Sequence, residues 1–352
     1  MQLWIAIIFS IVIGFGVSFG LGFVLIPWLH KLRFGQTILD IGPSWHKKKQ
    51  GTPTMGGFLF IIGTGVSLAV VLLTAKIRGV DLITYGSEKT PAMLYTKFFA
   101  GLLMALGFGF IGFIDDYIKV VKKRNLGLTE LQKTLMQMLV GFAYLFTLYK
   151  FAGVNYMFIP YYGNYVSTAL FWLVGVAALY CTTNAVNFLD GVDGLCASVT
   201  SLVSVAFAVA AILQKFAGMS ILCSAVFGSL LGYLIWNWNP SKVMMGDVGS
   251  LFLGGIVCAM AYAIDCPWII LLIGIIYVAE FGSDILQIAY IKTHHGKKLF
   301  RMAPIHHHYE LGGWSEKKIC VVFSLVTVLG SAAGIALLWF GRVVLRKQLY
   351  FV

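Results

Sequence analysis

The chain has 352 residues, of which 59% are hydrophobic and only 11% are charged, and its mean hydropathy is +0.87. Soluble domains carry about 25% charged residues, so this composition excludes an ordinary soluble protein and predicts that lipid surrounds most of the chain. The net charge of +12 would suggest nucleic acid in a soluble protein. Here the basic residues lie in loops between apolar segments, as the positive-inside rule describes, and we expect no nucleic-acid partner.

About ten apolar segments are long enough to cross a bilayer as helices, which takes roughly 20 residues. We therefore predict an all-α, multi-pass membrane protein with a single domain over residues 1–352. No basic stretch precedes the first segment, so we expect it to be retained and not cleaved as a signal peptide. The predicted spans are 3–29, 57–75, 95–114, 131–150, 166–186, 197–214, 219–238, 249–264, 267–291 and 319–341.

The ninth of these segments carries two acids, Glu280 and Asp284, and only a short turn at 265–267 separates it from the eighth. We expect a long helix that is tilted or bent. Glycines at 107–112 match the GxGxxG pattern of dinucleotide-binding proteins. They lie inside a predicted span, with no strand before them, so they indicate close helix packing. Gly228 and Gly232 are read in the same way.

Lys and Arg concentrate in the loops near 30–56, 115–130, 239–248 and 292–318. The positive-inside rule makes these loops cytoplasmic, and ten spans then place both termini on the extracytoplasmic side. Ionisable groups at membrane depth cost about 2.5–3.5 kcal/mol each on insertion scales and usually mark function. The acids and histidines of these loops and adjoining helix ends predict an active site on the cytoplasmic face. They are Asp115, Asp116, Asp190, Asp193, Asp247 and the run His306, His307, His308.

The pair Asp115–Asp116 is followed by Lys119 at the end of the third predicted span. Neighbouring residues of a helix point about 100° apart, so the two carboxylates are expected to do different work. One would hold a cation, the other would face a second reactant, and Lys119 would meet a phosphate. A solvated helix end before basic residues 122–124 is the alternative.

Asn187, Asp190 and Asp193 are spaced by three residues and would share one polar stripe if the segment were helical. Gly191 and Gly194 instead favour an unwound end that a ligand approaches closely. Metal chelation, hydrogen bonding to a sugar or base, and a plain turn stay open for this motif.

Asp247 lies between Gly246 and Gly249, just before a predicted span. It is either a helix N-cap or a magnesium ligand that bridges to substrate phosphates. The basic run at 46–49 leads into the glycine-rich segment 51–57, which indicates either a membrane anchor or diphosphate recognition.

The three consecutive histidines at 306–308 rarely point at one metal, and no cysteine lies nearby. We therefore favour phosphate or sugar contacts over zinc, with one histidine in proton transfer. Acids for a divalent cation and lysines for phosphates together suit phosphoryl transfer at the membrane surface.

Six motifs occur in an order and spacing that resemble the phospho-N-acetylmuramoyl-pentapeptide transferase family. This family is a branch of the polyprenyl-phosphate N-acetylhexosamine-1-phosphate transferases, and the resemblance covers nearly the whole chain. The motifs are GTPTMGG (51–57), DDYIK (115–119), NFLDGVDGL (187–195), NP (239–240), MGDVGSL (245–251) and APIHHHYE (303–310).

The resemblance implies that UDP-N-acetylmuramoyl-pentapeptide and undecaprenyl phosphate react to give lipid I and UMP, with Mg²⁺ as cofactor. It also implies a homodimer in the bacterial plasma membrane. The site residues it implies are catalytic Asp115, Asp116, Asp247 and His306; metal-binding Asp247 and Asp115; and substrate-binding Lys49, Thr54, Lys119, Asn187, Asp190, Asp193, Asn237, Gln287, His307 and His308.

Two positions depart from the family pattern: Met244 stands where the family usually has a phenylalanine, and Asp284 stands where an apolar residue is expected. Two rival functions are a sibling enzyme that transfers N-acetylglucosamine-1-phosphate and a cation-coupled transporter. A transporter would carry its acids in mid-span on paired repeats, whereas the acids here lie mostly at one face.

Overall fold

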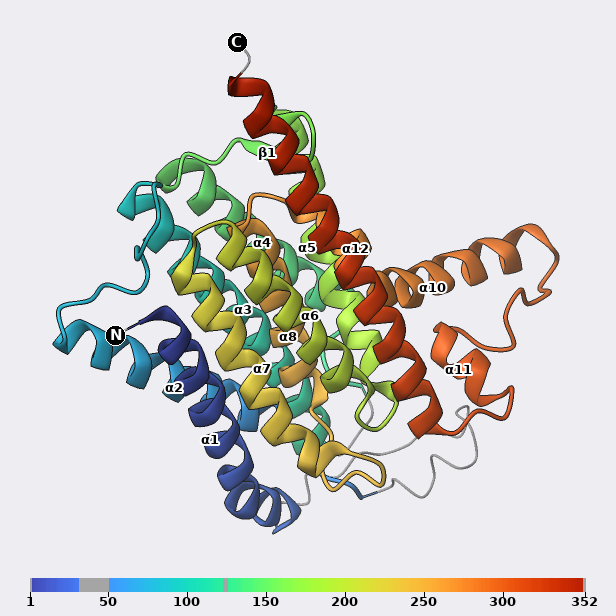
Figure 1. Cartoon of the computed structure of the whole chain (residues 1–352). Coiled ribbons are helices and arrows are strands. Elements are labelled where there is room, and N and C mark those ends of the chain that lie inside the picture. Colours follow the sequence, from blue (N-terminus) through green and yellow to red (C-terminus); the bar gives the residue numbers. More distant parts are fainter. Residues whose placement is uncertain (1, 32–50, 123–125, 351–352) are drawn as a thin grey trace.

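The computed structural model describes residues 2–31, 51–122 and 126–350, with side chains described as far as residue 343. This part of the chain forms a bundle of long helices (Figure 1). Nine of its helices are long and apolar enough to cross a membrane, and one bent pair makes a tenth. The predicted all-α architecture with about ten spans is confirmed, and the protein is a multi-pass membrane protein.

The elements follow one another along the chain with short connections. They are α1 (Leu3–Lys31), α2 (Gly57–Ile77), α3 (Pro91–Val121), α4 (Glu130–Phe151), β1 (Tyr156–Ile159), β2 (Gly163–Val166), α5 (Thr168–Phe188), the 3₁₀ turn η2 (Leu189–Gly191), α6 (Leu195–Leu213), α7 (Ala217–Asn237), α8 (Gly246–Ala263), the 3₁₀ turn η3 (Pro267–Ile269), α9 (Ile270–Ile273), α10 (Ile275–Thr293), α11 (Ile305–Glu310) and α12 (Glu316–Tyr350).

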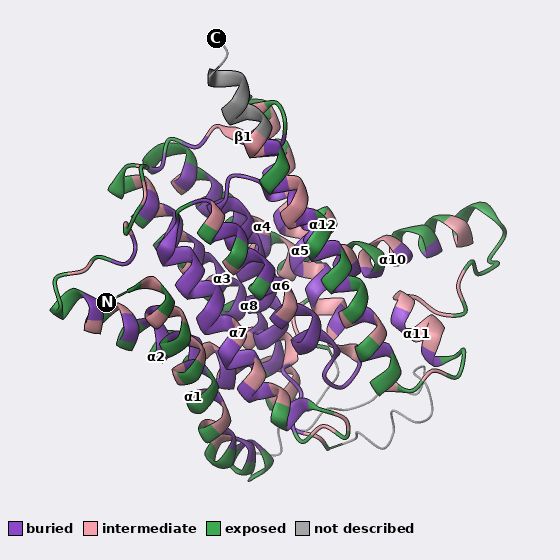
Figure 2. Ribbon diagram, in the orientation of Figure 1, coloured by how far each residue is buried: buried purple, intermediate pink, exposed green. Residues whose placement is uncertain are grey.

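Helix α8 lies at the centre of the bundle and is buried on nearly all sides, with α6 and α7 beside it (Figure 2). Its sequence from Val248 to Ala263 has no charged residue, as expected of a helix that contacts only other helices. The outer helices, such as α1 and α4, present apolar side chains to the surroundings, since less than a third of their apolar windows is buried.

Glycines let the helices approach closely, as the sequence predicted. Gly112 of α3 lies against the carbonyl oxygen of Asp247, only 2.0 Å from where a β carbon would be. Gly228 of α7 meets the carbonyl oxygen of Ile11 in α1 in the same way, at 2.2 Å. Any larger residue would separate these helix pairs, so the GxGxxG pattern serves packing.

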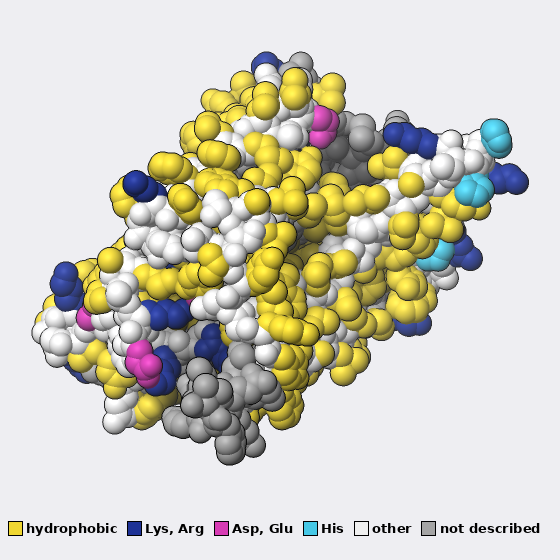
Figure 3. Space-filling model, turned by 90° about the horizontal axis from the view of Figure 1, so that it is seen from above, with side chains coloured by type: hydrophobic (Ala, Val, Ile, Leu, Met, Phe, Trp, Pro, Cys, Tyr) yellow, Lys and Arg dark blue, Asp and Glu magenta, His cyan; other side chains and the backbone are white. Residues whose placement is uncertain are grey.

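The span predicted at 267–291 is broken: α9 and α10 meet at Gly274 with a bend of 90°. Helix α10 therefore leaves the bundle as an arm, and α11 lies below it in Figure 1. Seen from above, His, Lys and Arg side chains gather at the outer end of this arm (Figure 3). The expected bend is confirmed.

One element was not predicted. Strands β1 and β2 form an antiparallel hairpin in which Tyr156 pairs with Val166 and Ile159 pairs with Gly163. Left-handed backbone at Tyr161 and Gly163 closes its turn. The strands have four residues each, too short for a hydrophobic periodicity to distinguish them from a loop.

Candidate active site

Three aspartates meet where the end of α3 lies beside the start of α8. Asp115 and Asp116 belong to the last turns of α3, and Asp247 belongs to the first turn of α8. Each offers a carboxylate oxygen within 4.8 Å of the other two. The close approach at Gly112 brings the two helix ends together. The predicted convergence of these three acids is therefore present, and we call them the acidic cluster.

Two lysines neutralise the acidic cluster. The Nζ atom of Lys119 lies 2.5 Å from Asp115 Oδ2 and 3.1 Å from Asp247 Oδ2. Lys133 of α4 reaches the same Asp247 oxygen at 3.0 Å. Sequence reasoning missed Lys133, although it is a charged residue near the start of a predicted span, which is itself a functional signal. The cluster thus combines three formal negative charges with two positive ones.

The adjacent carboxylates have different partners, as their positions on a helix predicted. Asp115 Oδ1 accepts a hydrogen bond of 2.7 Å from the backbone N–H of Leu128, before α4. Asp116 Oδ2 accepts one of 3.2 Å from the backbone N–H of Val248, in the first turn of α8. Asp115 is therefore fixed to the α3–α4 connection, and Asp116 is fixed to α8.

Asn187, at the end of α5, joins a third helix to the acidic cluster. Its Nδ2 atom donates to Asp247 Oδ1 at 2.8 Å and to Ser250 Oγ at 2.7 Å. Both oxygens of Asp247 are thus engaged, one by an amide and the other by two ammonium groups. Asp247 is held in one orientation by α3, α4 and α5 together.

The acidic cluster has the donor set that Mg²⁺ prefers, namely carboxylate oxygens that leave room for water and phosphate ligands. A second group of metal-ligand type in the described part of the chain consists of His306, His307 and Glu310, also within 4.8 Å of one another. Its mixed nitrogen and oxygen donors suit Mg²⁺ less well. Asp115, Asp116 and Asp247 are the residues that fit a magnesium ion.

The segment with Asp190 and Asp193 forms an unwound end and not a continuous helical stripe. Helix α5 stops at Phe188, and after the η2 turn the backbone is left-handed at Gly194, with φ +76°. Asp190 is half-buried within this turn. The glycines therefore allow the chain to reverse before α6, which is the second of the two structures considered from sequence.

Asp193 and Asn237, both predicted to bind substrate, are buried and connect loops. Asp193 accepts hydrogen bonds from the backbone N–H of Ser241 at 3.0 Å and from its hydroxyl at 2.9 Å. Asn237 accepts from the N–H of Gly194 at 3.0 Å and donates to the carbonyl of Val243 at 2.9 Å. These contacts fix the 189–194 turn to the 238–245 loop, just before Asp247.

The GTPTMGG segment packs against the same loop. The backbone N–H of Gly56 donates to Met244 O at 2.8 Å, and that of Gly57 donates to Met245 O at 3.0 Å. A β carbon on Gly246 would lie 2.4 Å from Asp116 Oδ2 and 2.5 Å from Thr54 Oγ1, so Thr54 lies beside the acidic cluster. Lys49 lies outside the described residues.

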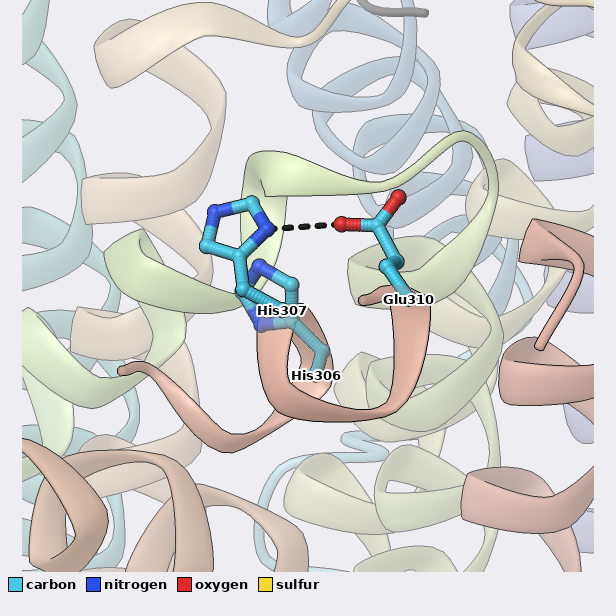
Figure 4. A group of neighbouring side chains, drawn as sticks. All are labelled: His306, His307 and Glu310. Carbon is cyan, nitrogen blue, oxygen red and sulfur yellow. Dashed lines mark hydrogen bonds and ion pairs between the residues drawn. The ribbon is translucent and has the colours of Figure 1, made fainter. Parts of the chain in front are cut away.

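The three histidines point in different directions, as expected for consecutive residues. The Nδ1 atoms of His306 and His307 pair with carboxylates, Glu280 at 2.9 Å and Glu310 at 2.6 Å. Figure 4 shows the two rings side by side, with Glu310 facing His307. His308 turns away, and its Nδ1 accepts from the backbone N–H of Arg301 at 3.1 Å.

The remaining predicted positions have local partners. Gln287 of α10 accepts hydrogen bonds from the N–H groups of Leu299 and Phe300 and donates to the carbonyl of Phe300, which fixes the α10–α11 loop. Met244 is buried, and its sulfur contacts Ser241 Oγ at 3.4 Å. Asp284 lies one helical turn after the buried Glu280.

Comparisons with known proteins agree with this site. Residues 98–265 match the family model described as glycosyl transferase family 4. A protein of Listeria monocytogenes serotype 4b (strain CLIP80459), named phospho-N-acetylmuramoyl-pentapeptide-transferase, is 41% identical over 324 residues, covering 90% of this chain and 93% of its own. A relative of the same name from Clostridium perfringens (strain 13 / Type A) is 42% identical, covering 92% and 96%.

A third relative of the same name, from Bacillus mycoides (strain KBAB4), is 41% identical over 326 residues and covers 92% of this chain and 95% of its own. The matched region of the family model includes Asp115, Asp116, Asn187 and Asp247. Identity at this level over nearly the full length shows common membership. The chain belongs to the phospho-N-acetylmuramoyl-pentapeptide-transferase family.

Proposed function

We propose that the protein transfers phospho-N-acetylmuramoyl-pentapeptide from its UDP-linked donor to undecaprenyl phosphate, giving lipid I and UMP in peptidoglycan synthesis. A phosphate oxygen of the lipid forms a bond to the β-phosphorus of the donor. The bond from that phosphorus to the oxygen bridging it to UMP breaks, so the sugar phosphate moves to the lipid.

The observation that carries this proposal is the acidic cluster with Lys119 and Lys133 at the meeting point of α3, α4 and α8. Phosphoryl transfer depends on positioning and on neutralising charge. Two ammonium groups that share Asp247 supply positive charge for phosphate oxygens. The acids lie at helix ends and not in mid-span, which favours this reaction over a transporter.

We propose Mg²⁺ as cofactor, with Asp247 and Asp115 as its first candidate ligands and Asp116 beside them. When bound, the ion would bridge carboxylates to the donor diphosphate and neutralise the charge that develops on it. The two lysines lie among the same carboxylates. We propose that they turn toward substrate phosphates when the ion and the donor bind.

Asp115 or Asp116 would orient or deprotonate the lipid phosphate, or attack the donor in a two-step route. In the structure each carboxylate accepts a hydrogen bond from a backbone N–H, at 2.7 Å for Asp115 and 3.2 Å for Asp116. Asp115 also contacts Lys119, at 2.5 Å. Asn187 would keep Asp247 in place throughout, since it donates to Asp247 Oδ1.

We also propose that the acidic cluster faces the cytoplasm, that both termini lie outside, and that the protein is a homodimer of the bacterial plasma membrane. The orientation is supported by the Lys and Arg count of the loops, and the homodimer by the resemblance alone. Labelling of single cysteines placed in alternate loops tests the orientation. Light scattering of the purified protein tests the oligomeric state.

The function is tested by measuring UMP release from purified protein with UDP-N-acetylmuramoyl-pentapeptide, undecaprenyl phosphate and Mg²⁺. We expect release that requires the lipid and stops when EDTA is added. Release with UDP-N-acetylglucosamine instead would move the protein to the sibling branch of transferases. A folded protein that releases UMP from neither donor would contradict the proposal.

A further inference from the structure

Glu280 is a fully buried acid that the proposed reaction does not yet use. It lies on α10 with no solvent exposure, and its Oε2 atom is 2.9 Å from Nδ1 of His306, which is also fully buried. Buried acids in a membrane helix are costly and are usually paired. The pair joins α10 to α11 across 26 residues of sequence.

The pair sets the proton position on His306. An ionised carboxylate can only accept hydrogen bonds, so Nδ1 of His306 carries the proton and its Nε2 atom bears a lone pair. In the described part of the chain, neither His306 Nε2 nor Glu280 Oε1 has a hydrogen-bond partner. Buried polar atoms without a partner are few in proteins. Two of them in one contact indicate a role beyond packing.

The free nitrogen of His306 faces the turn that carries the acidic motif residues. A β carbon on Gly191 would lie 2.7 Å from His306 Nε2 and 3.3 Å from its Cε1. Gly191 ends η2, directly after Asp190 and two residues before Asp193. The imidazole ring of His306 is therefore held between Glu280 on one side and this turn on the other.

The next residue of α11 faces outward. His307 is partly exposed, its side chain keeping 15% of its accessible surface, and Glu310 fixes its Nδ1 atom at 2.6 Å. The rings of His306 and His307 lie 4.1 Å apart, centre to centre (Figure 4). A displacement of His306 would therefore also displace His307.

We propose that Glu280 is a positioning residue for the transfer reaction: it holds His306 against Gly191 and so sets the position of His307 relative to Asp190. The inference rests on the proposed function, because it assigns the 189–194 turn and His307 to donor recognition. Glu280 acts through His306 and touches no substrate itself. Losing it should weaken donor binding more than it weakens folding.

The experiment compares Glu280→Met and Glu280→Gln with wild type in UMP release and in equilibrium binding of UDP-N-acetylmuramoyl-pentapeptide. Met removes the acceptor, and we expect kcat/KM and donor affinity to fall by about tenfold or more, since a buried N–H group is left unpaired. Gln keeps an oxygen that accepts from Nδ1, and we expect it to restore most of the loss. Unchanged donor affinity in Glu280→Met would overturn the proposal.

Tyr277→Phe is the matched control, because Tyr277 lies one turn earlier on α10 and its hydroxyl is bonded to Thr200 at 2.8 Å. This variant loses a buried hydrogen bond of the same helix without touching His306. We expect a lower unfolding temperature and an unchanged donor affinity. A loss of affinity equal to that of Glu280→Met would mean that general loosening of α10 explains both, and would contradict a specific role.

A double-mutant cycle distinguishes positioning from packing. In a His306→Ala background, we expect Glu280→Met to cause no further loss of donor affinity, which is measurable even when turnover is slow. Effects that multiply in the double variant would show that Glu280 acts independently of His306. A wild-type protein that releases no UMP would instead contradict the proposed function itself.

Gly191→Ala tests the other side of the same ring without altering Glu280. Its methyl group would collide with His306 Nε2, so we expect at least a tenfold loss of donor affinity in an otherwise wild-type chain. We expect the same substitution to be tolerated in the His306→Ala background, where the space is free. Equal losses in both backgrounds would show that Gly191 matters for the turn alone and would overturn the coupling. This arm also decides the question if Glu280→Met fails to fold.

Discussion

Lys133 Nζ lies 3.0 Å from Asp247 Oδ2, and Lys119 Nζ reaches the same oxygen at 3.1 Å. One carboxylate oxygen therefore receives ammonium groups from two different helices, α4 and α3. Both lysines keep some exposure, Lys119 more than Lys133. Two cations on one oxygen are more than a single buried acid needs, which indicates that one is available for a second anion.

Lys133→Met should lower kcat/KM for UMP release by about tenfold or more, because a charge-assisted contact to a phosphate contributes about 1.5–3 kcal/mol. The same change should lower the Mg²⁺ concentration needed for half-maximal activity, since a positive charge beside the candidate metal ligands is removed. Both values come from one titration of Mg²⁺ at saturating donor. Lys215→Met, which removes an exposed lysine paired with Glu88, is the control for charge. Wild-type values in both measurements would exclude Lys133 from the site.

Asp247→Asn should abolish UMP release while the protein stays folded. Asparagine keeps the size of the side chain and an oxygen for the Asn187 amide, which donates at 2.8 Å, but it removes the charge that would bind Mg²⁺. The expected loss is at least about a hundredfold, as for removal of a group needed in the transition state. Raising Mg²⁺ should restore little. A variant that turns over normally with an unchanged Mg²⁺ requirement would exclude Asp247 as a metal ligand.

Much of this site could be predicted because its residues interrupt apolar patterns. Asp115, Asp116 and Asp247 stand at the ends of hydrophobic segments, where a charge is conspicuous. Lys133 was hidden by the same reasoning, since it lies only three residues into α4 and resembles a membrane-surface anchor. Which acid it pairs with depends on how α4 packs on α8, and no local pattern encodes that. The histidine orientations, too, depend on Glu280 and Glu310, whose partners are set by the bend at Gly274.

The roles of Asp193 and Asn237 were the hardest to read from sequence. Their spacing suits ligand contacts, yet both are buried and bonded to backbone groups of neighbouring loops. A polar residue next to glycines looks the same in sequence whether it faces a ligand or ties a loop. The distinction depends on the path of the 238–245 loop, which is set by tertiary contacts to Gly56 and Gly57.

Asp193→Ala should lower both stability and donor affinity, because three donors from Asn239 and Ser241 lose their acceptor. We expect a decrease of about 1–3 kcal/mol in the free energy of unfolding. Ser241→Ala, which removes only the hydroxyl donor, should cause a smaller loss of both. Thermal unfolding and donor titration of the two variants measure this order. A full loss of donor affinity in Asp193→Ala without any loss of stability would show direct ligand contact instead.

A separate charged group lies at the far end of α8, roughly 24 Å from Asp247 for 16 residues at 1.5 Å each. Here Asp265 contacts the fully buried Lys97 of α3, and Lys89 lies 2.6 Å from its other oxygen. Removing one member of a buried ion pair leaves an uncompensated charge. Asp265→Asn should therefore lower the free energy of unfolding by about 3–5 kcal/mol. Replacing both partners, Asp265→Leu with Lys97→Met, should cost much less. If the double variant is less stable than Asp265→Asn, the pair stabilises the fold by more than mutual neutralisation.

The same pair predicts a dependence of stability on pH. Burial raises the pKa of Asp265, but the ammonium groups of Lys97 and Lys89 outweigh this effect and leave the pKa below its ordinary value. A depressed pKa in the folded state contributes stability that is fully present above the unfolded pKa of about 3.9. That contribution is lost as the pH falls from about 4 through the folded value. Wild type should lose unfolding temperature in this range faster than Asp265→Asn, which has no carboxylate to protonate. Parallel curves for the two proteins would show that Asp265 is not held ionised by its lysines.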